Sequence, residues 1–317
     1  MRTAFADEIT KLGVEDPRVV LLSGDIGNRM FDDFKAQSGS RFLNCGIAEA
    51  NMMSMAAGMA LSGLRPVIYT ITPFTTTRCL EQIRVGVCYH KAPVIIVGTG
   101  SGLSYSSLGP THHSLEDVAI LRTLPGMIVF SPADKAELRA GLREALKQDK
   151  PVYIRLGKKN EPQVHSDELD HSLTLGKSTT IREGSDVCLI GSGNILPEVV
   201  SAADALAESG VSAHVESFHT VKPLDTERLS HLFERFSLVA VSEEHSIIGG
   251  LNSAVAQWMV EQPAKPGTKL VSIATRDEFL HEIGNHDFAR RHFGIDAKSI
   301  KERVIEALKA QKESLPK

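Results

Sequence analysis

The chain has 317 residues, of which 42% are hydrophobic and 23% charged, and its formal net charge is −4. This length exceeds one typical hydrophobic core and suits two domains, and the composition is that of a soluble globular protein. The small negative charge gives no electrostatic basis for binding nucleic acid or an anionic membrane surface, so neither partner is expected.

Short β-branched segments alternate with helical patterns along almost the whole chain, which is typical of parallel α/β architecture. In the first half, the expected strands are 18–23, 66–71, 93–98, 127–131 and 151–156. The helices expected between them are 47–61, 76–90, 115–121 and 134–146. Helix 47–61 is apolar on nearly every side, which predicts that it is buried.

A polar, irregular stretch separates this half from a second α/β unit. We expect a linker at 161–180, with one domain at 1–160 and another at 181–317. In the second domain the expected strands are 186–191, 213–218, 237–242 and 269–274, and the expected helices are 196–209, 225–236, 249–260 and 297–311. The sequence therefore predicts two doubly wound α/β domains.

The cysteines and the N-terminal segment both indicate a cytoplasmic protein. Cys45, Cys79, Cys88 and Cys188 form no CxxC pair and have no zinc-ligand spacing, so reduced thiols are expected. The first residues carry charges at short intervals and lack the apolar stretch of a signal peptide. No apolar run is long enough to span a bilayer.

Loops that follow expected strands carry unusual residues, and ligands of parallel α/β sheets bind at such strand ends. Asp25 follows the first strand, where a carboxylate can face a ligand or form an Asx turn. Phe74 stands at the next strand-to-helix junction, and its ring is suited to packing in the core or to stacking on a flat heterocycle. Glu49 stands in the first turn of the apolar helix, where a carboxylate either satisfies the helix N-terminus or serves a reaction in a dry pocket.

The longest loop combines closely spaced glycines with a histidine pair. Gly98, Gly100 and Gly102 permit close approach of a ligand to the backbone but do not form the GxGxxG pattern of a dinucleotide site. His112 and His113 follow a Gly-Pro turn, and no third residue has the spacing of a metal ligand. Such imidazoles can bond to a polyol, shuttle a proton or form a surface pair.

Four motifs occur in an order and at a spacing that resemble the transketolase family. They are Gly46-Ile-Ala-Glu-Ala-Asn-Met52, Gly109-Pro-Thr-His112, Thr220-Val-Lys-Pro-Leu-Asp225 and Glu243-Glu-His-Ser-Ile-Ile-Gly-Gly250. Together they look like the pyrimidine-binding and C-terminal domains of a transketolase, and the resemblance covers essentially the whole chain. It implies a thiamine diphosphate-dependent transferase of carbohydrate metabolism that moves a two-carbon ketol unit from a ketose to an aldose.

The resemblance also implies roles for individual residues. Glu49 matches the glutamate that hydrogen-bonds the aminopyrimidine ring of the cofactor. Phe74 lies in the segment that supplies the aromatic pocket for that ring, and Asp25 matches an acidic position near the cofactor. His112 matches a histidine that contacts substrate hydroxyl groups, with His113 beside it.

Three departures from the family pattern concern the substrate. Leu108 stands where an acidic residue usually precedes the Gly-Pro-Thr-His motif, and Gly100 stands where the family has a further histidine. The arginine that binds a sugar phosphate aligns near Lys158, with Arg155 as a rival, and a lysine binds phosphate as a point charge without a bidentate fork. The sugars and their phosphorylation therefore stay open.

The family's motif for the diphosphate and its metal is absent from the sequence. Members carry Gly-Asp-Gly followed at a distance by asparagine, and Gly24-Asp-Ile-Gly-Asn28 is too compressed to match. We therefore expect the C-terminal subunit of a split enzyme, with Mg²⁺ or another divalent ion held mainly by an N-terminal partner subunit. By analogy, this chain would form a dimer within a heterotetramer.

Three alternatives stay open at this point. The β subunit of a 2-oxo acid dehydrogenase has the same pair of domains, and a synthase that joins pyruvate to an aldehyde uses the same cofactor. The Gly-Pro-Thr-His and Glu-Glu-His sequences favour the transketolase branch. A non-catalytic assembly subunit would have no need of Glu49, which argues against that interpretation.

Overall fold

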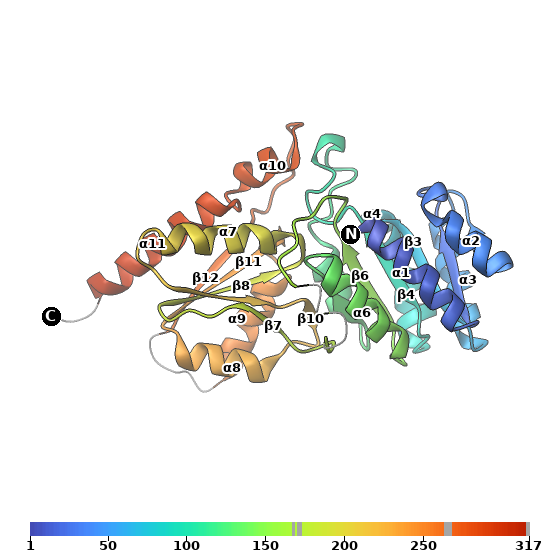
Figure 1. Ribbon diagram of the computed structural model, residues 1–317, viewed down its shortest axis with the longest axis horizontal. Helices are drawn as coiled ribbons and strands as arrows, with labels where there is room; N and C mark the ends of the chain where they lie inside the picture. The colour runs from blue at the N-terminus through green and yellow to red at the C-terminus, as the bar shows by residue number, and fades with distance from the viewer. Residues whose placement is uncertain (167–168, 170–172, 263–267, 315–317) are drawn as a thin grey trace.

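The computed structural model describes residues 1–166, 169, 173–262 and 268–314. It contains a seven-stranded sheet and a five-stranded sheet, with helices packed against both (Figure 1). Within these ranges, no helix combines the length and the apolar composition that a membrane crossing requires. The prediction of two α/β domains is confirmed.

The first sheet has the strand order β10-β5-β6-β4-β3-β1-β2, and every neighbouring pair except β10 with β5 is parallel. Its strands are β1 (Val19–Ser23), β2 (Phe42–Asn44), β3 (Arg65–Ile71), β4 (Ile95–Thr99), β5 (Ile128–Phe130), β6 (Val152–Leu156) and β10 (Thr220–Lys222). Its helices are α1 (Arg2–Glu15), α2 (Asp32–Ser38), α3 (Glu49–Leu61), α4 (Thr72–Thr75), α5 (Asp117–Arg122) and α6 (Lys135–Lys147). The central strands are runs of aliphatic residues buried on both faces, as parallel sheets require.

The second sheet has the order β12-β11-β8-β9-β7, with only β7 antiparallel to its neighbour. Its strands are β7 (Thr179–Arg182), β8 (Val187–Ser192), β9 (Ala213–Ser217), β11 (Leu238–Ser246) and β12 (Lys269–Thr275). Its helices are α7 (Leu196–Ala207), α8 (Thr226–Arg235), α9 (Leu251–Glu261), α10 (His286–Phe293) and α11 (Ala297–Ser314). In Figure 1, α7 and α11 lie on one side of this sheet and α8 and α9 on the other.

Every strand expected from the sequence is present, and the unexpected elements lie at edges and ends. Helices α1, α2 and α10 and the short strands β2, β7 and β10 were not predicted. Strand β10 belongs by sequence to the second predicted domain, yet it pairs with β5 at the edge of the first sheet. The linker prediction of 161–180 includes residues 167–168 and 170–172, which lie outside the described residues.

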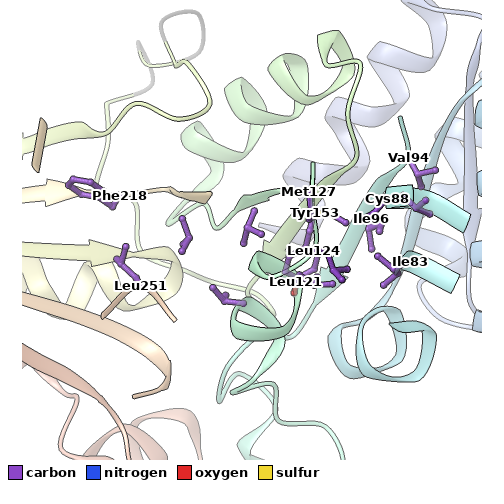
Figure 2. Close-up of a cluster of buried hydrophobic side chains, with 14 of the residues drawn as sticks. Ile83, Cys88, Val94, Ile96, Leu121, Leu124, Met127, Tyr153, Phe218 and Leu251 are labelled. Atoms are coloured by element: carbon purple, nitrogen blue, oxygen red, sulfur yellow. The ribbon is translucent and has the colours of Figure 1, made fainter. Parts of the chain in front are cut away.

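One apolar cluster is shared by the two sheets. Helices α3 and α5 contribute to it from the first sheet, and α8 and α9 contribute from the second. Figure 2 shows Leu121 and Tyr153 of the first unit in the same cluster as Phe218 and Leu251 of the second. Because the core is continuous, the second domain has a fixed position against the loops of the first.

Two predicted helices differ from expectation. Helix α3 starts at Glu49, and only one of its sides is buried, because Met55 and Leu61 are 37% and 59% exposed. The prediction of all-round burial is therefore wrong for the single chain, which leaves an apolar side of α3 uncovered. The segment predicted as one helix at 76–90 consists of a 3₁₀ turn at Thr77–Cys79 and a π-helix at Gln82–Tyr89. Such turns often mark functional sites or hinges.

A buried ion cluster fastens the chain after β6 to the start of α6. His165 Nδ1 lies 3.0 Å from Asp134 Oδ2, and His165 Nε2 lies 3.1 Å from Glu137 Oε1. Asp134 also caps α6, accepting hydrogen bonds from the backbone N–H groups of Ala136 and Glu137. Burial by itself lowers the pKa of His165, but the two carboxylates outweigh it and raise this pKa to about 10.

We expect His165 to make the stability of the protein depend on pH above neutrality. Because its pKa is raised to about 10 in the folded state, its contribution is complete below about pH 6.5 and is lost as the pH rises toward 10. His165→Gln should lower the free energy of unfolding near pH 6 by about 3 kcal/mol and flatten the decline at higher pH. Urea unfolding across this range measures both effects, with the exposed His231→Gln as the control. Parallel pH profiles for His165→Gln and the wild-type chain would contradict the assignment.

Candidate active site

The predicted site residues come from loops at one edge of the first sheet. Asp25 follows β1, Glu49 follows β2, Phe74 follows β3 and His112 follows β4. These strands are neighbours in the order β4-β3-β1-β2 and run parallel, so their carboxyl ends lie at the same edge.

Glu49 is a buried carboxylate with one hydrogen-bond partner. Its side chain is 5% exposed, and Oε2 accepts a hydrogen bond of 2.8 Å from Nη1 of Arg78. Among the described residues, Oε1 has no hydrogen-bond partner, and neither oxygen bonds the backbone N–H groups of α3. Simple capping of the helix therefore does not account for this side chain, although the helix dipole favours its charge.

Arg78 links Glu49 to Phe74. It lies in the 3₁₀ turn after α4, and its Cζ is 4.0 Å from the centroid of the Phe74 ring. The Arg78 side chain is 44% exposed, whereas the neighbouring Cys79 is buried. Burial, and then the charge of Glu49, raise the pKa of the Cys79 thiol to about 12, so a neutral group borders the carboxylate. One planar cation thus contacts both the carboxylate and the aromatic face.

His112 extends the site beyond Phe74. Its ring centroid is 5.5 Å from that of Phe74 and 6.0 Å from that of Tyr105. Its Nδ1 lies 2.9 Å from the hydroxyl oxygen of Thr111, which leaves Nε2 without a partner in the described part of the chain. A half-buried imidazole with one unpartnered nitrogen can donate to or accept from a ligand hydroxyl group.

Tyr105 explains the glycine at position 100. Gly100 has a φ of +76°, and a Cβ there would lie 1.8 Å from the Tyr105 ring. The ammonium group of Lys158 is 4.7 Å from the centroid of the same ring and forms no ion pair with a described residue. Tyr105 was missed in the sequence, where its only signal was the unusual glycine. It places the cation of Lys158 beside His112.

Arg155 does not join this group of side chains. It is 3% exposed, and its Nε donates a hydrogen bond of 2.7 Å to Asp117. Its Nη2 donates to the backbone oxygens of Ser114 and Glu244 at 2.9 and 3.0 Å. The predicted contact of Arg155 with substrate therefore does not agree with its position, since its guanidinium ties the His112 loop to the second domain.

His113 also points to a different surrounding from His112. It is 6% exposed and lines a cavity of about 330 Å³ together with residues 276–280 of the second domain. Burial lowers the pKa of His113, so its imidazole is neutral near pH 7. The structure therefore does not bring His113 to the Phe74 side of the loop.

The second domain anchors the His112 loop through Glu244. Its Oε1 accepts hydrogen bonds from the backbone N–H of Leu103 and the amide of Asn194 at 2.8 and 3.0 Å. Its Oε2 accepts one of 2.7 Å from Arg290 Nε and lies 2.8 Å from His286 Nε2. Burial by itself raises the pKa of Glu244, but His286 and Arg290 outweigh it and hold this pKa well below its usual range. The permanent charge can therefore fix the loop at any physiological pH.

Asp25 lies at the turn that leads into α3. It is exposed, its backbone N–H donates to the oxygen of Gly46, and its Oδ1 accepts a hydrogen bond of 3.2 Å from Asn44. The residues that the structure describes contain no cluster of three or more metal-binding side chains. The four cysteines are free thiols.

Comparison with known proteins gives two domain matches. Residues 1–163 match the family model of the transketolase pyrimidine-binding domain, and residues 176–300 match that of the transketolase C-terminal domain.

Individual relatives cover nearly the whole chain. A 6-deoxy-6-sulfo-D-fructose transketolase subunit from Clostridium sp. is 37% identical over 95% of this chain and 92% of its own length. One of the two subunits of an apulose-4-phosphate transketolase from Phocaeicola vulgatus is 32% identical over 97% of both chains. A solved structure described as a split gene transketolase, inactive beta4 tetramer, has a TM-score of 0.88 and 33% identity, covering 97% of this chain and 98% of that one.

Proposed function

The chain belongs to the transketolase family, and on this premise we propose that it is the subunit of a split transketolase that activates the cofactor. The resemblance read from four sequence motifs is confirmed, as is the expectation of a transferase that works with a partner subunit. The 2-oxo acid dehydrogenase, carboligase and assembly-subunit alternatives have no better support. The observation that carries the proposal is the buried carboxylate of Glu49 beside the aromatic face of Phe74.

The aminopyrimidine end of thiamine diphosphate fits these side chains. Phe74 presents an aromatic face for the flat ring, and Glu49 Oε1 is a hydrogen-bond acceptor with no partner among the described residues. When bound, the cofactor supplies the carbon nucleophile and the electron sink for cleavage beside a ketose carbonyl. In this proposal Glu49 holds a proton in common with a ring nitrogen, and burial keeps water from competing for that bond. Asp25 borders the same turn as a cofactor-side carboxylate.

We assign the diphosphate and a divalent ion such as Mg²⁺ mainly to a partner subunit. The support is the missing Gly-Asp-Gly motif and the lack of a metal-binding cluster in the described ranges. The exposed apolar side of α3, with Met55 and Leu61, supports burial against another chain, in keeping with a dimer inside a heterotetramer. A cytoplasmic location is part of the proposal and rests on the free thiols.

We further propose that the substrate is a sugar with an anionic group at one end. The names of two relatives specify a sulfonated and a phosphorylated sugar. Here Lys158 supplies an ammonium group without an ion-pair partner among the described residues, close to His112 through the Tyr105 ring. We therefore assign the anion to Lys158 and the sugar hydroxyl groups to His112. His113 and Arg155 act on the loop from behind.

Lys158→Ala should raise the KM for an anionic ketose about tenfold or more and change kcat much less. The reason is that a point charge binding a remote group of the substrate contributes about equally to the bound state and the transition state. Steady-state kinetics of the two-subunit enzyme measure this, with the exposed neighbour Lys159→Ala as the control. An equal effect of both variants, or none, would remove the anion from Lys158.

A further inference from the structure

We propose that Arg78 is an internal occupant of the pyrimidine pocket, which the cofactor must displace in order to bind. The inference rests on the proposed function, because it takes Glu49 and Phe74 as the groups that receive the aminopyrimidine ring. It concerns the chain before the cofactor arrives, and it assigns Arg78 a role that neither the motifs nor the family matches give it.

A single guanidinium group makes both contacts that the ring would need. Arg78 Nη1 donates to Glu49 at 2.8 Å, and Arg78 Cζ is 4.0 Å above the Phe74 ring. Guanidinium and aminopyrimidine are both planar, both stack on aromatic faces and both donate N–H groups to a carboxylate. Since one face of Phe74 cannot hold two planes at once, the ring and Arg78 exclude each other there.

The contact also has a purpose in the empty chain. A carboxylate as buried as Glu49, which is 5% exposed, is costly unless it is paired. Arg78 provides that pair and shields the apolar ring until the cofactor replaces it. The carboxylate can then keep its buried position without a bound ligand.

Release of Arg78 is feasible. Its side chain is 44% exposed, and Glu49 is its only hydrogen-bond partner among the described residues. It lies between α4 and the π-helix Gln82–Tyr89, in an irregular segment with no regular helix to unwind. A half-exposed ion pair with a cation–π contact is weak enough that displacement reduces the apparent affinity of the cofactor by about tenfold.

The test compares Arg78→Ala with Arg84→Ala, which removes the same charge from a residue whose side chain is 65% exposed and which lies 3.9 Å from Glu81. Isothermal titration of the two-subunit complex with thiamine diphosphate and Mg²⁺ gives the Kd. We expect Arg78→Ala to lower the Kd about tenfold and Arg84→Ala to leave it unchanged. Arg78→Lys keeps the charge but loses the planar stack, so its Kd should fall between those of the wild type and Arg78→Ala.

A second readout does not depend on the cofactor. In the full chain alone, Arg78→Ala leaves Glu49 unpaired and should lower the melting temperature, whereas Arg84→Ala should not. Tighter cofactor binding by a less stable chain is the combination that a pocket occupant predicts and that a general structural role does not.

Glu49→Ala separates the failure of this inference from failure of the proposed function. If Glu49→Ala weakens binding while Arg78→Ala weakens it too or leaves it unchanged, the pocket stands and Arg78 is not its occupant. If Glu49→Ala also leaves the Kd unchanged, the pyrimidine site itself is misplaced, and the inference about Arg78 is overturned with it.

Discussion

Glu49→Gln should reduce the kcat of the two-subunit enzyme by about 10²–10⁴-fold, the usual range for losing a positioned proton-transfer group. Glutamine keeps the size of the side chain and can still accept a hydrogen bond, but it cannot hold a proton in common with a ring nitrogen. The side chain is 5% exposed, so water cannot replace the missing carboxylate. This makes the expected loss larger than for any other single substitution in the chain.

The fold should tolerate this change, because the amide remains a hydrogen-bond acceptor for Arg78. Thermal unfolding should therefore show a small shift, and the Kd of thiamine diphosphate should change far less than kcat. Glu81→Gln is the matched control, since that carboxylate is 70% exposed and its nearest cation is Arg84 at 3.9 Å. Unchanged turnover in Glu49→Gln would refute the role of Glu49 in cofactor activation.

The alternating pattern of the sequence predicted the buried strands and failed at the edges. Runs such as Val19–Ser23 and Val187–Ser192 are aliphatic because both of their faces are covered, so the pattern is unambiguous. Strand β10 has only three residues and pairs across the domain boundary, and no local pattern shows its partner. Helix α3 shows the same limit, because an apolar side destined for another chain looks like a core side in one sequence.

The site was predictable where one residue carries the chemistry and not where several residues share a position. Glu49 and Phe74 stood out by residue type in their segments, and the structure places them in contact with the same guanidinium. Arg78 itself gave no signal, because an arginine in a polar turn is ordinary. Arg155 looked like an anion site in the sequence, and only the structure shows that Asp117 and two backbone oxygens already occupy it.

The isolated chain should transfer no ketol unit above background, at least about 10³-fold below the two-subunit complex, even with thiamine diphosphate and Mg²⁺ in excess. The physical reason is that the described residues offer the ring a carboxylate and an aromatic face but offer the diphosphate no metal cluster. A cofactor held at one end cannot keep its reactive carbon in register with His112 and Lys158. The related structure described as an inactive beta4 tetramer fits this expectation.

Titration with a partner chain that carries the Gly-Asp-Gly and asparagine motif should restore activity, and the rise should end at one partner per chain. Glu49→Gln provides the control, since it should bind the partner equally well and still fail to turn over. A partner with its motif aspartate replaced by asparagine should assemble without activity, which separates metal binding from assembly. Full activity of the isolated chain would contradict the split site, because both ends of the cofactor would then have to be held by this chain.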